Sequence, residues 1–202
     1  TLMRSSAASD VYKRQAFVGE NELAQTTLFK ILMGEWEPDE GSVKWGVSTS
    51  RSYLPKDNTE YFEGCTMELV DWIRQYSAKK DDVYLRGFLG RMLISGEDVF
   101  KPVNVLSGGE KARCMLSKMM LSGANVVLLD QPTNHLDMSS ISWLETYLLN
   151  YRGSVLIVSH DRYFLDRIAS KIIEIDNTKV TVFSGNYSDY AAKKEQLRQA
   201  QR

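Results

Sequence analysis

Asp130 stands out in this 202-residue chain as a residue whose type and position could do chemistry. It follows an apolar run at residues 126–129 (VVLL), which is typical of a strand covered on both faces in a parallel sheet. Open α/β sheets bind ligands at the carboxyl ends of their strands. We therefore expect the Asp130 carboxylate to meet a phosphate-bound metal ion, with a core strand that ends in an ordinary turn as the alternative.

A second polar cluster, residues 106–110 (LSGGE), precedes a segment whose apolar residues have helical spacing. Ser107 can cap that helix, and Gly108 and Gly109 let the backbone come close to an anion. The free N–H groups and the positive end of the helix dipole then favour a phosphate. An ordinary turn that caps a core helix is the alternative.

His160 follows another apolar run, residues 154–158 (SVLIV), and so stands at a strand end as Asp130 does. A neutral imidazole near a triphosphate could contact the γ-phosphate or the attacking water. A hydrogen-bonded structural histidine would fit the same position.

These three clusters, in this order, resemble the motifs of ATP-binding cassette (ABC) ATPases. They are most similar to the ABC-F group, whose members carry paired cassettes and no membrane domain. The resemblance covers residues 16 to about 190. LSGGEKAR (106–113) is similar to the ABC signature, VVLLDQP (126–132) to the Walker B strand, TNHLD (133–137) to the D-loop and SHD (159–161) to the switch-histidine motif. The strings FKILMGE and YLPKDN look most like the second cassette of a bacterial ABC-F protein.

The resemblance implies an α/β fold of the P-loop NTPase type. It has a mainly parallel core sheet, an antiparallel β part and a helical subdomain at about residues 57–106. It also implies ATP and Mg²⁺ as ligands, with Thr26 and Asp130 at the metal and Gln131 and His160 in catalytic positions. The residues expected to bind nucleotide are Gly19, Asn21, Ala24, Gln25, Thr26, Thr27, Lys56, Ser107, Gly108, Gly109, Asp130 and Asp137.

The phosphate loop departs from the family pattern, which is Gly-x-x-x-x-Gly-Lys-Ser/Thr between a strand and a helix. The matching residues 19–26 read GENELAQT. Ala24 replaces a glycine, Gln25 replaces the lysine, and Glu22 adds a negative charge beside the phosphates. Backbone cradling can persist, but the loss of the lysine is expected to weaken nucleotide binding roughly 10- to 100-fold.

Two further positions differ from the family. Gln131 stands where the family has a glutamate general base. An amide cannot accept the proton, and a positioned base contributes about 10²- to 10⁴-fold, so hydrolysis is expected to be slow. Lys56 stands in place of the Q-loop glutamine, where it either restores part of the lost positive charge or is a solvated loop lysine.

The rest of the sequence predicts the elements that position these residues. Residues 1–15 fit no cassette pattern and read as a non-native, adapter-like leader, with a genuine disordered leader as the alternative. One ABC domain is expected at 16–190, and a terminal or linker helix begins within 187–202. The expected elements are a strand at 16–18, a helix at 26–33 ended by Gly34, antiparallel strands at 43–45 and 51–54, helices at 139–151 and 163–169, and strands at 171–176 and 180–183.

The composition excludes several classes of protein. The chain is 43% hydrophobic and 25% charged, as in ordinary soluble domains, and no run approaches the roughly 18 apolar residues of a membrane span. Cys65 and Cys114 lack the spacing of a metal site or a disulfide, which favours a reducing, cytoplasmic location. A net charge of −1 lacks the overall positive charge typical of nucleic-acid-binding domains. Any contact with a ribosome or its RNA would therefore depend on a local group of basic residues.

Family mechanism implies a head-to-tail partner, a second ABC cassette that would be intramolecular in the full-length protein. Ser107 and Gly109 would then contact the γ-phosphate held by the opposite cassette. A ribosome-associated translation ATPase is the expected function. The alternatives are the ATP-binding subunit of an ABC transporter and a nucleotide-binding module that does not hydrolyse ATP. The PTNHLD string, Lys56 and the absence of a membrane segment count against the transporter.

Overall fold

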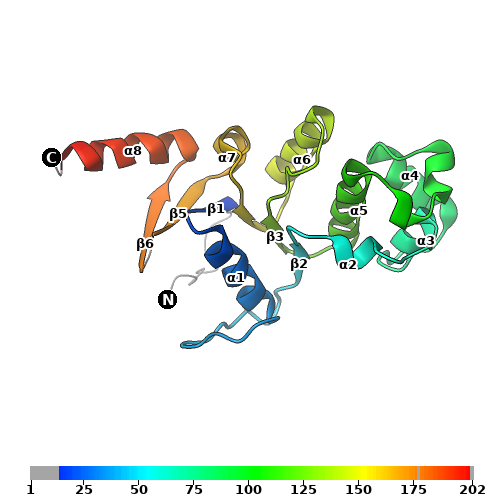
Figure 1. Ribbon diagram of the computed structural model, residues 1–202, viewed down its shortest axis with the longest axis horizontal. Coiled ribbons are helices and arrows are strands. Elements are labelled where there is room, and N and C mark those ends of the chain that lie inside the picture. The colour runs from blue at the N-terminus through cyan, green and yellow to red at the C-terminus, as the bar shows by residue number, and fades with distance from the viewer. Residues whose placement is uncertain (1–13, 177, 201–202) are drawn as a thin grey trace.

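A six-stranded sheet forms the centre of the chain, which the computed structural model describes at residues 14–176 and 178–200 (Figure 1). The strand order is β2-β3-β4-β1-β5-β6. The strands are β1 (Arg14–Val18), β2 (Arg51–Leu54), β3 (Val126–Asp130), β4 (Ser154–Val158), β5 (Lys171–Asp176) and β6 (Lys179–Ser184). Neighbouring strands from β2 to β5 are parallel, and β6 is antiparallel to β5. The expected α/β class, with a mainly parallel sheet and an antiparallel part, is confirmed.

Helices cover both faces of this sheet. Helix α1 (Glu22–Met33) lies on one face, and α6 (Met138–Asn150) and α7 (Arg162–Ile168) lie on the other (Figure 1). Side chains alternate across a strand, so Leu128 packs under α1 with Phe29 while Leu129 joins the opposite core with Leu144. Strands buried on both faces are continuous apolar runs, which explains why β3 and β4 stand out in the sequence.

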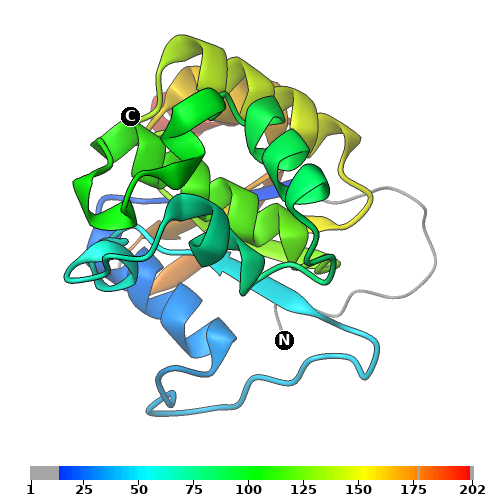
Figure 2. The same cartoon turned by 90° about the vertical axis from the view of Figure 1, so that its right-hand side faces the viewer.

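A compact group of helices occupies the end of the molecule next to β2, in front of the sheet in Figure 2. It contains α2 (Thr59–Phe62), α3 (Leu69–Arg74), α4 (Asp82–Arg91), the 3₁₀ turns Gly96–Phe100 and Val103–Val105, and α5 (Gly108–Leu121). The fully buried Phe62 and Trp72 stack in its core, with ring centroids 5.1 Å apart. All of these elements except α5 fall in the region expected to be helical, at about residues 57–106, and α5 begins directly after that region.

Three expectations about the first strands are wrong. Residues 43–45 form no strand; the Trp45 indole instead donates to the Leu32 carbonyl at 2.9 Å. Strand β2 is parallel to β3, and the antiparallel pair is β5 with β6. Strand β1 starts at Arg14, two residues inside the segment expected to lie outside the fold; residues 1–13 of that segment lie outside the described residues.

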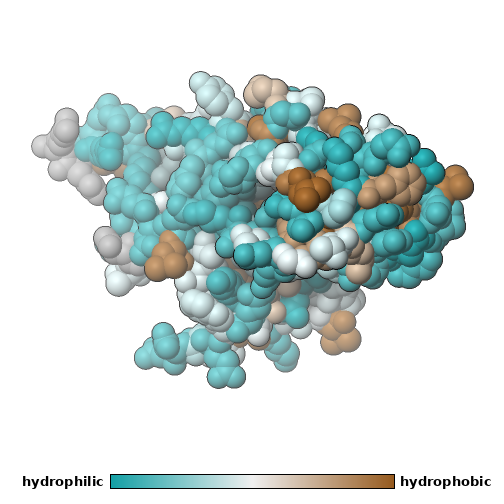
Figure 3. Space-filling model, turned by 45° about the vertical axis from the view of Figure 1, so that its right-hand side comes forward, coloured by the Kyte–Doolittle hydropathy of each residue, from teal (hydrophilic) through white to brown (hydrophobic). Residues whose placement is uncertain are grey.

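The surface shown in Figure 3 is mainly hydrophilic, with hydrophobic residues scattered over it. Helix α8 (Tyr187–Ala200) extends from the edge of the sheet at β6, opposite the helical end (Figure 1). Across the ranges 14–176 and 178–200, we find no helix with the length and apolar character needed to span a bilayer.

Candidate functional site

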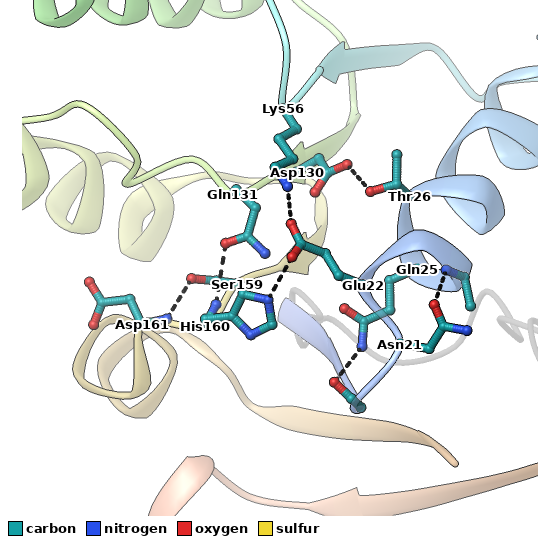
Figure 4. Close-up of polar contacts among 12 residues, drawn as sticks. Asn21, Glu22, Gln25, Thr26, Lys56, Asp130, Gln131, Ser159, His160 and Asp161 are labelled. Atoms are coloured by element: carbon teal, nitrogen blue, oxygen red, sulfur yellow. Dashed lines mark hydrogen bonds and ion pairs between the residues drawn. The ribbon is translucent and has the colours of Figure 1, made fainter. Parts of the chain in front are cut away.

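Asp130 lies at the carboxyl end of β3 and is 1% exposed (Figure 4). The Thr26 hydroxyl donates a hydrogen bond to its Oδ2 at 2.8 Å. Its Oδ1 is buried and has no hydrogen-bond partner among the described residues. Burial raises the pKa of this carboxyl above its usual value, and the bond from Thr26 only partly opposes that effect. A buried acid with one unused oxygen suits a cation that would complete its bonding.

The residues around Asp130 fit Mg²⁺. This ion keeps several waters and takes only one or two protein oxygens, with substrate phosphates as further ligands. Asp130 and Thr26 offer such a pair, one from the end of a strand and one from the first turns of α1. Within the described residues no group of three or more His, Cys, Asp or Glu could form an all-protein metal cage, and Mg²⁺ with a phosphate does not need one.

Gln131 follows Asp130 in a left-handed backbone conformation, with φ of 51°. Its own N–H donates to the Val158 carbonyl at 2.8 Å, and its Oε1 accepts from the His160 N–H at 3.3 Å. Its Nε2 is buried and unpaired within the part of the chain that the structure describes. The side chain is therefore held beside His160 with a free donor (Figure 4).

Helix α1 begins at Glu22, four residues earlier than the expected start at residue 26. Asn21 is its N-cap: the side chain accepts from the Ala24 N–H at 3.0 Å, and the carbonyl accepts from the Gln25 N–H at 3.4 Å. Alanine favours a helix where glycine would favour a loop, and an acid in the first turn suits the helix dipole. The expected backbone cradle is thus shortened, because two of its N–H groups are already used.

Gln25, in the place of the family lysine, is 2% exposed and turned inward. Its Nε2 donates to the Gly19 carbonyl at 3.3 Å (Figure 4). Gly19 has φ of 159°, and a Cβ there would lie 2.3 Å from the Ile175 carbonyl oxygen, so only glycine fits this position. The hydrogen bond from the Gln25 side chain to Gly19 therefore anchors the loop in this structure. Thr27 lies partly buried beside Thr26 on α1.

Glu22 is at the centre of the close-up in Figure 4, and its carboxylate meets two nitrogen groups. Its Oε1 forms an ion pair with Lys56 Nζ, and its Oε2 lies 3.3 Å from His160 Nε2. The hydrogen bond from Lys56 lowers the pKa of Glu22, and the same bond raises the pKa of Lys56. Lys56 is thus neither a freely solvated lysine nor an unopposed positive charge for phosphate.

Ser107 caps α5, as expected, and completes a capping box. Its hydroxyl accepts from the Glu110 N–H at 3.2 Å, and the Glu110 carboxylate accepts from the Ser107 N–H at 2.7 Å. A Cβ on Gly109 would lie 3.2 Å from the His135 carbonyl oxygen, so the start of α5 packs directly on residues 133–137.

Asp137 belongs to this second cluster. It caps α6 by accepting from the Ser140 N–H at 2.8 Å and lies 3.9 Å from Arg113 Nη1. The expected site residues therefore form two groups. The first holds Gly19, Asn21, Ala24, Gln25, Thr26, Thr27, Lys56, Asp130, Gln131 and His160, and the second holds Ser107, Gly108, Gly109 and Asp137.

Sequence reasoning noted the charge of Glu22 but missed its partners. Lys56 is 34 residues away along the chain and His160 is 138 residues away. The usable signal was present, because the parallel strands β1, β2 and β4 end at one edge of the sheet and Glu22, Lys56 and His160 follow them in turn.

Comparison with known proteins identifies the family. The ABC transporter family profile matches residues 10–134. The "Uncharacterized ABC transporter ATP-binding protein YkpA" of Bacillus subtilis (strain 168) is 57% identical over 176 residues, which are 87% of this chain and 33% of that protein. The "Energy-dependent translational throttle protein EttA" of Haemophilus influenzae is 38% identical over 181 residues, which are 86% of this chain and 32% of that protein.

A solved structure gives the same result. A chain in the crystal structure of the complex of archaeal ribosomal stalk protein aP1 and archaeal ribosome recycling factor aABCE1 superposes with a TM-score of 0.63 at 28% identity, covering 80% of this chain and 31% of that chain. The chain spans about a third of the length of the curated relatives it matches. It belongs to the ABC transporter family of ATP-binding cassettes, and the resemblance to ABC-F cassettes that its motifs carry is confirmed.

Proposed function

We propose that this chain is the ATP-binding cassette of an ABC-F type translation ATPase and that its own nucleotide site hydrolyses ATP slowly. The observation that carries the proposal is the pair Asp130 and Thr26. A buried carboxylate with one unpaired oxygen meets a helix hydroxyl at the carboxyl edge of a parallel sheet. Asp130 and Thr26 would hold Mg²⁺ there, and the ion would supply positive charge that offsets the charge of the phosphates.

The side chains around this pair support slow chemistry. Gln131 occupies the position of the general base, and its buried Nε2 can donate to a phosphate or to water but cannot take a proton. His160 is held beside it through the bond to Gln131 Oε1. Gln25 is turned toward Gly19, so no lysine reaches the terminal phosphates from this loop.

The second cluster supports a head-to-tail pairing with another cassette. Ser107 and Gly109 present the start of α5, a helix of 14 residues, with its capping box formed. The positive end of that helix suits a γ-phosphate held by the partner, which would lie in the same polypeptide in the full-length protein.

The setting we propose is the cytoplasm, on the ribosome. The name of EttA describes a translational throttle, and the archaeal complex joins a ribosomal stalk protein to a ribosome recycling factor. The rival function is a nucleotide-binding module without hydrolysis, which Gln131 and the ion pair of Glu22 favour. The ATP-binding subunit of a transporter is the other alternative, and an experiment should distinguish it from a ribosome-bound ATPase.

Steady-state hydrolysis tests the proposal directly. The protein is compared with a variant that carries Gln25→Lys and Gln131→Glu together. We expect weak Mg-ATP binding and slow turnover in the parent, and turnover about 10²- to 10⁴-fold faster in the variant. Gln131→Asn is the matched control, because it changes the same side chain without supplying a base. Equal turnover in the parent and the double variant would contradict the assignment of both positions.

A further inference from the structure

The carboxylate of Glu22 fills a place where two positive or hydrogen-bonding groups converge. Lys56 reaches it from the loop after β2, and His160 reaches it from the loop after β4. A lysine and an imidazole that face one point suit an anion at that point, because an anion is a charged acceptor and accepts stronger hydrogen bonds than a neutral group does. In this structure the anion is supplied by the chain itself (Figure 4).

The same point lies at the reacting end of the proposed nucleotide site. His160 is joined to Gln131, which follows Asp130, and Asp130 is joined to Thr26. The buried Asp130 Oδ1 and Gln131 Nε2 both lack partners in the described part of the chain, which marks this end as the place for a ligand. A chain of phosphates that starts at the loop around Gly19 and ends near Gln131 would bring its terminal phosphate to Lys56 and His160.

We infer that Glu22 is a specificity-determining residue that occupies the position of the terminal phosphate, so that this site favours a nucleoside diphosphate over a triphosphate. The inference rests on the proposed nucleotide site. A diphosphate leaves the ion pair of Glu22 and Lys56 in place. A triphosphate must displace the carboxylate, because two anions cannot share the same two donors without strong repulsion.

The structure also shows what holds the Glu22 carboxylate in this position. It is the first residue of α1, where a negative charge interacts favourably with the helix dipole, and Asn21 fixes the start of the helix. The carboxylate is therefore preorganised between Lys56 and His160. An isosteric amide at residue 22 would keep the shape and remove the charge that competes with phosphate.

The test is to measure the affinities of the 202-residue protein for Mg-ATP, Mg-ADP and inorganic tripolyphosphate by calorimetry, in the parent, Glu22→Gln and Glu37→Gln. Glu37 is an exposed acid beyond the other end of α1 and controls for the change in net charge. We expect Glu22→Gln to bind ATP and tripolyphosphate about tenfold more tightly and ADP within about twofold of the parent, because only the longer ligands meet the carboxylate. Glu37→Gln should bind all three ligands as the parent does.

The outcomes separate the two proposals. An ATP affinity that does not change in Glu22→Gln, or ATP and ADP affinities that rise equally, would overturn the role of Glu22 and leave the nucleotide site standing. A gain for tripolyphosphate without binding of either nucleotide would support the role of Glu22 and overturn the proposed nucleotide function. Failure of every ligand to bind every variant would overturn both.

Discussion

Thr26 Oγ1 lies 2.8 Å from Asp130 Oδ2, although the two residues are 104 positions apart in the sequence. The bond joins the first turns of α1 to the end of β3 and leaves the other carboxylate oxygen without a partner among the described residues. Helix, strand and proposed metal site are therefore tied together by one hydroxyl.

Thr26→Val should destabilise the protein by about 1 to 3 kcal/mol, because it removes the hydrogen bond to a buried carboxylate. The change is nearly isosteric, so packing contributes little to the loss. The free energy of unfolding in urea measures the effect. Thr26→Ser keeps the hydroxyl and is expected to retain most of the stability; an equal loss in both variants would show that the hydroxyl contributes no more to stability than the methyl group that serine lacks.

Asp130→Asn should stabilise the protein at neutral pH while it weakens binding of Mg-ATP. Burial raises the pKa of Asp130 above its usual value of 3.8, so the ionised form costs the folded state free energy. Below pH 3.8 the carboxyl is protonated in both states and the substitution gains nothing. The gain should appear as the pH rises above that value and should level off once the carboxyl of the folded protein is ionised as well.

Urea unfolding from acid to neutral pH follows this gain, with the exposed Asp39→Asn as the matched control. A stability of Asp130→Asn that runs parallel to that of Asp39→Asn over the whole range would show that the Asp130 charge costs the folded protein nothing.

Ser107→Arg should block nucleotide-dependent pairing of cassettes, because a bulky side chain would fill the start of α5. It should spare ATP binding to the loop around Gly19, which belongs to the other cluster. Ser107→Ala is the control: it loses the cap, worth about 1 kcal/mol, without adding bulk. Nucleotide affinity and cassette association are measured separately in a two-cassette protein that contains this chain. Loss of ATP binding with association intact would contradict the head-to-tail arrangement.

A two-cassette protein that contains this chain should sediment with ribosomes in the presence of ATP. Helix α8 offers Lys193 and Arg198 for binding to RNA phosphates, whereas Lys194 is already paired with Glu174. The logarithm of the binding constant falls linearly with the logarithm of the salt concentration. Replacing Lys193 and Arg198 by glutamine should make this slope shallower by about 1 for each of the two residues that binds a phosphate. Sedimentation with membranes alone would favour the transporter subunit.

Much of the fold could be predicted from local pattern. The buried runs of β3, β4 and β5 and the cap at Ser107 needed no knowledge of distant residues. The edge strand β2 could not be placed in this way, because its pairing depends on a partner far along the chain: the Ser50 N–H donates to Asn125 Oδ1 across 75 residues. Residues 43–45 looked like a strand because valine and tryptophan favour strands. In the structure they form none, and the Trp45 indole donates to the Leu32 carbonyl at the end of α1.

The candidate site shows the same limit. The position of Asp130 followed from its strand, and the capping by Ser107 from its neighbours. The early start of α1 depended on Ala24 and on the side chain of Asn21, which a loop motif does not reveal. The triad of Glu22, Lys56 and His160 required three segments to meet, so it became visible only in the folded chain.

The packing of Gly109 against the His135 carbonyl restricts which residue can stand at position 109. With 3.2 Å available for a Cβ, any larger residue at position 109 would push residues 133–137 away from α5. His135 lies only five positions after the buried Asp130. The start of α5, which would face a second cassette, and the buried Asp130 are thus connected by one short stretch of chain that begins at a direct backbone contact.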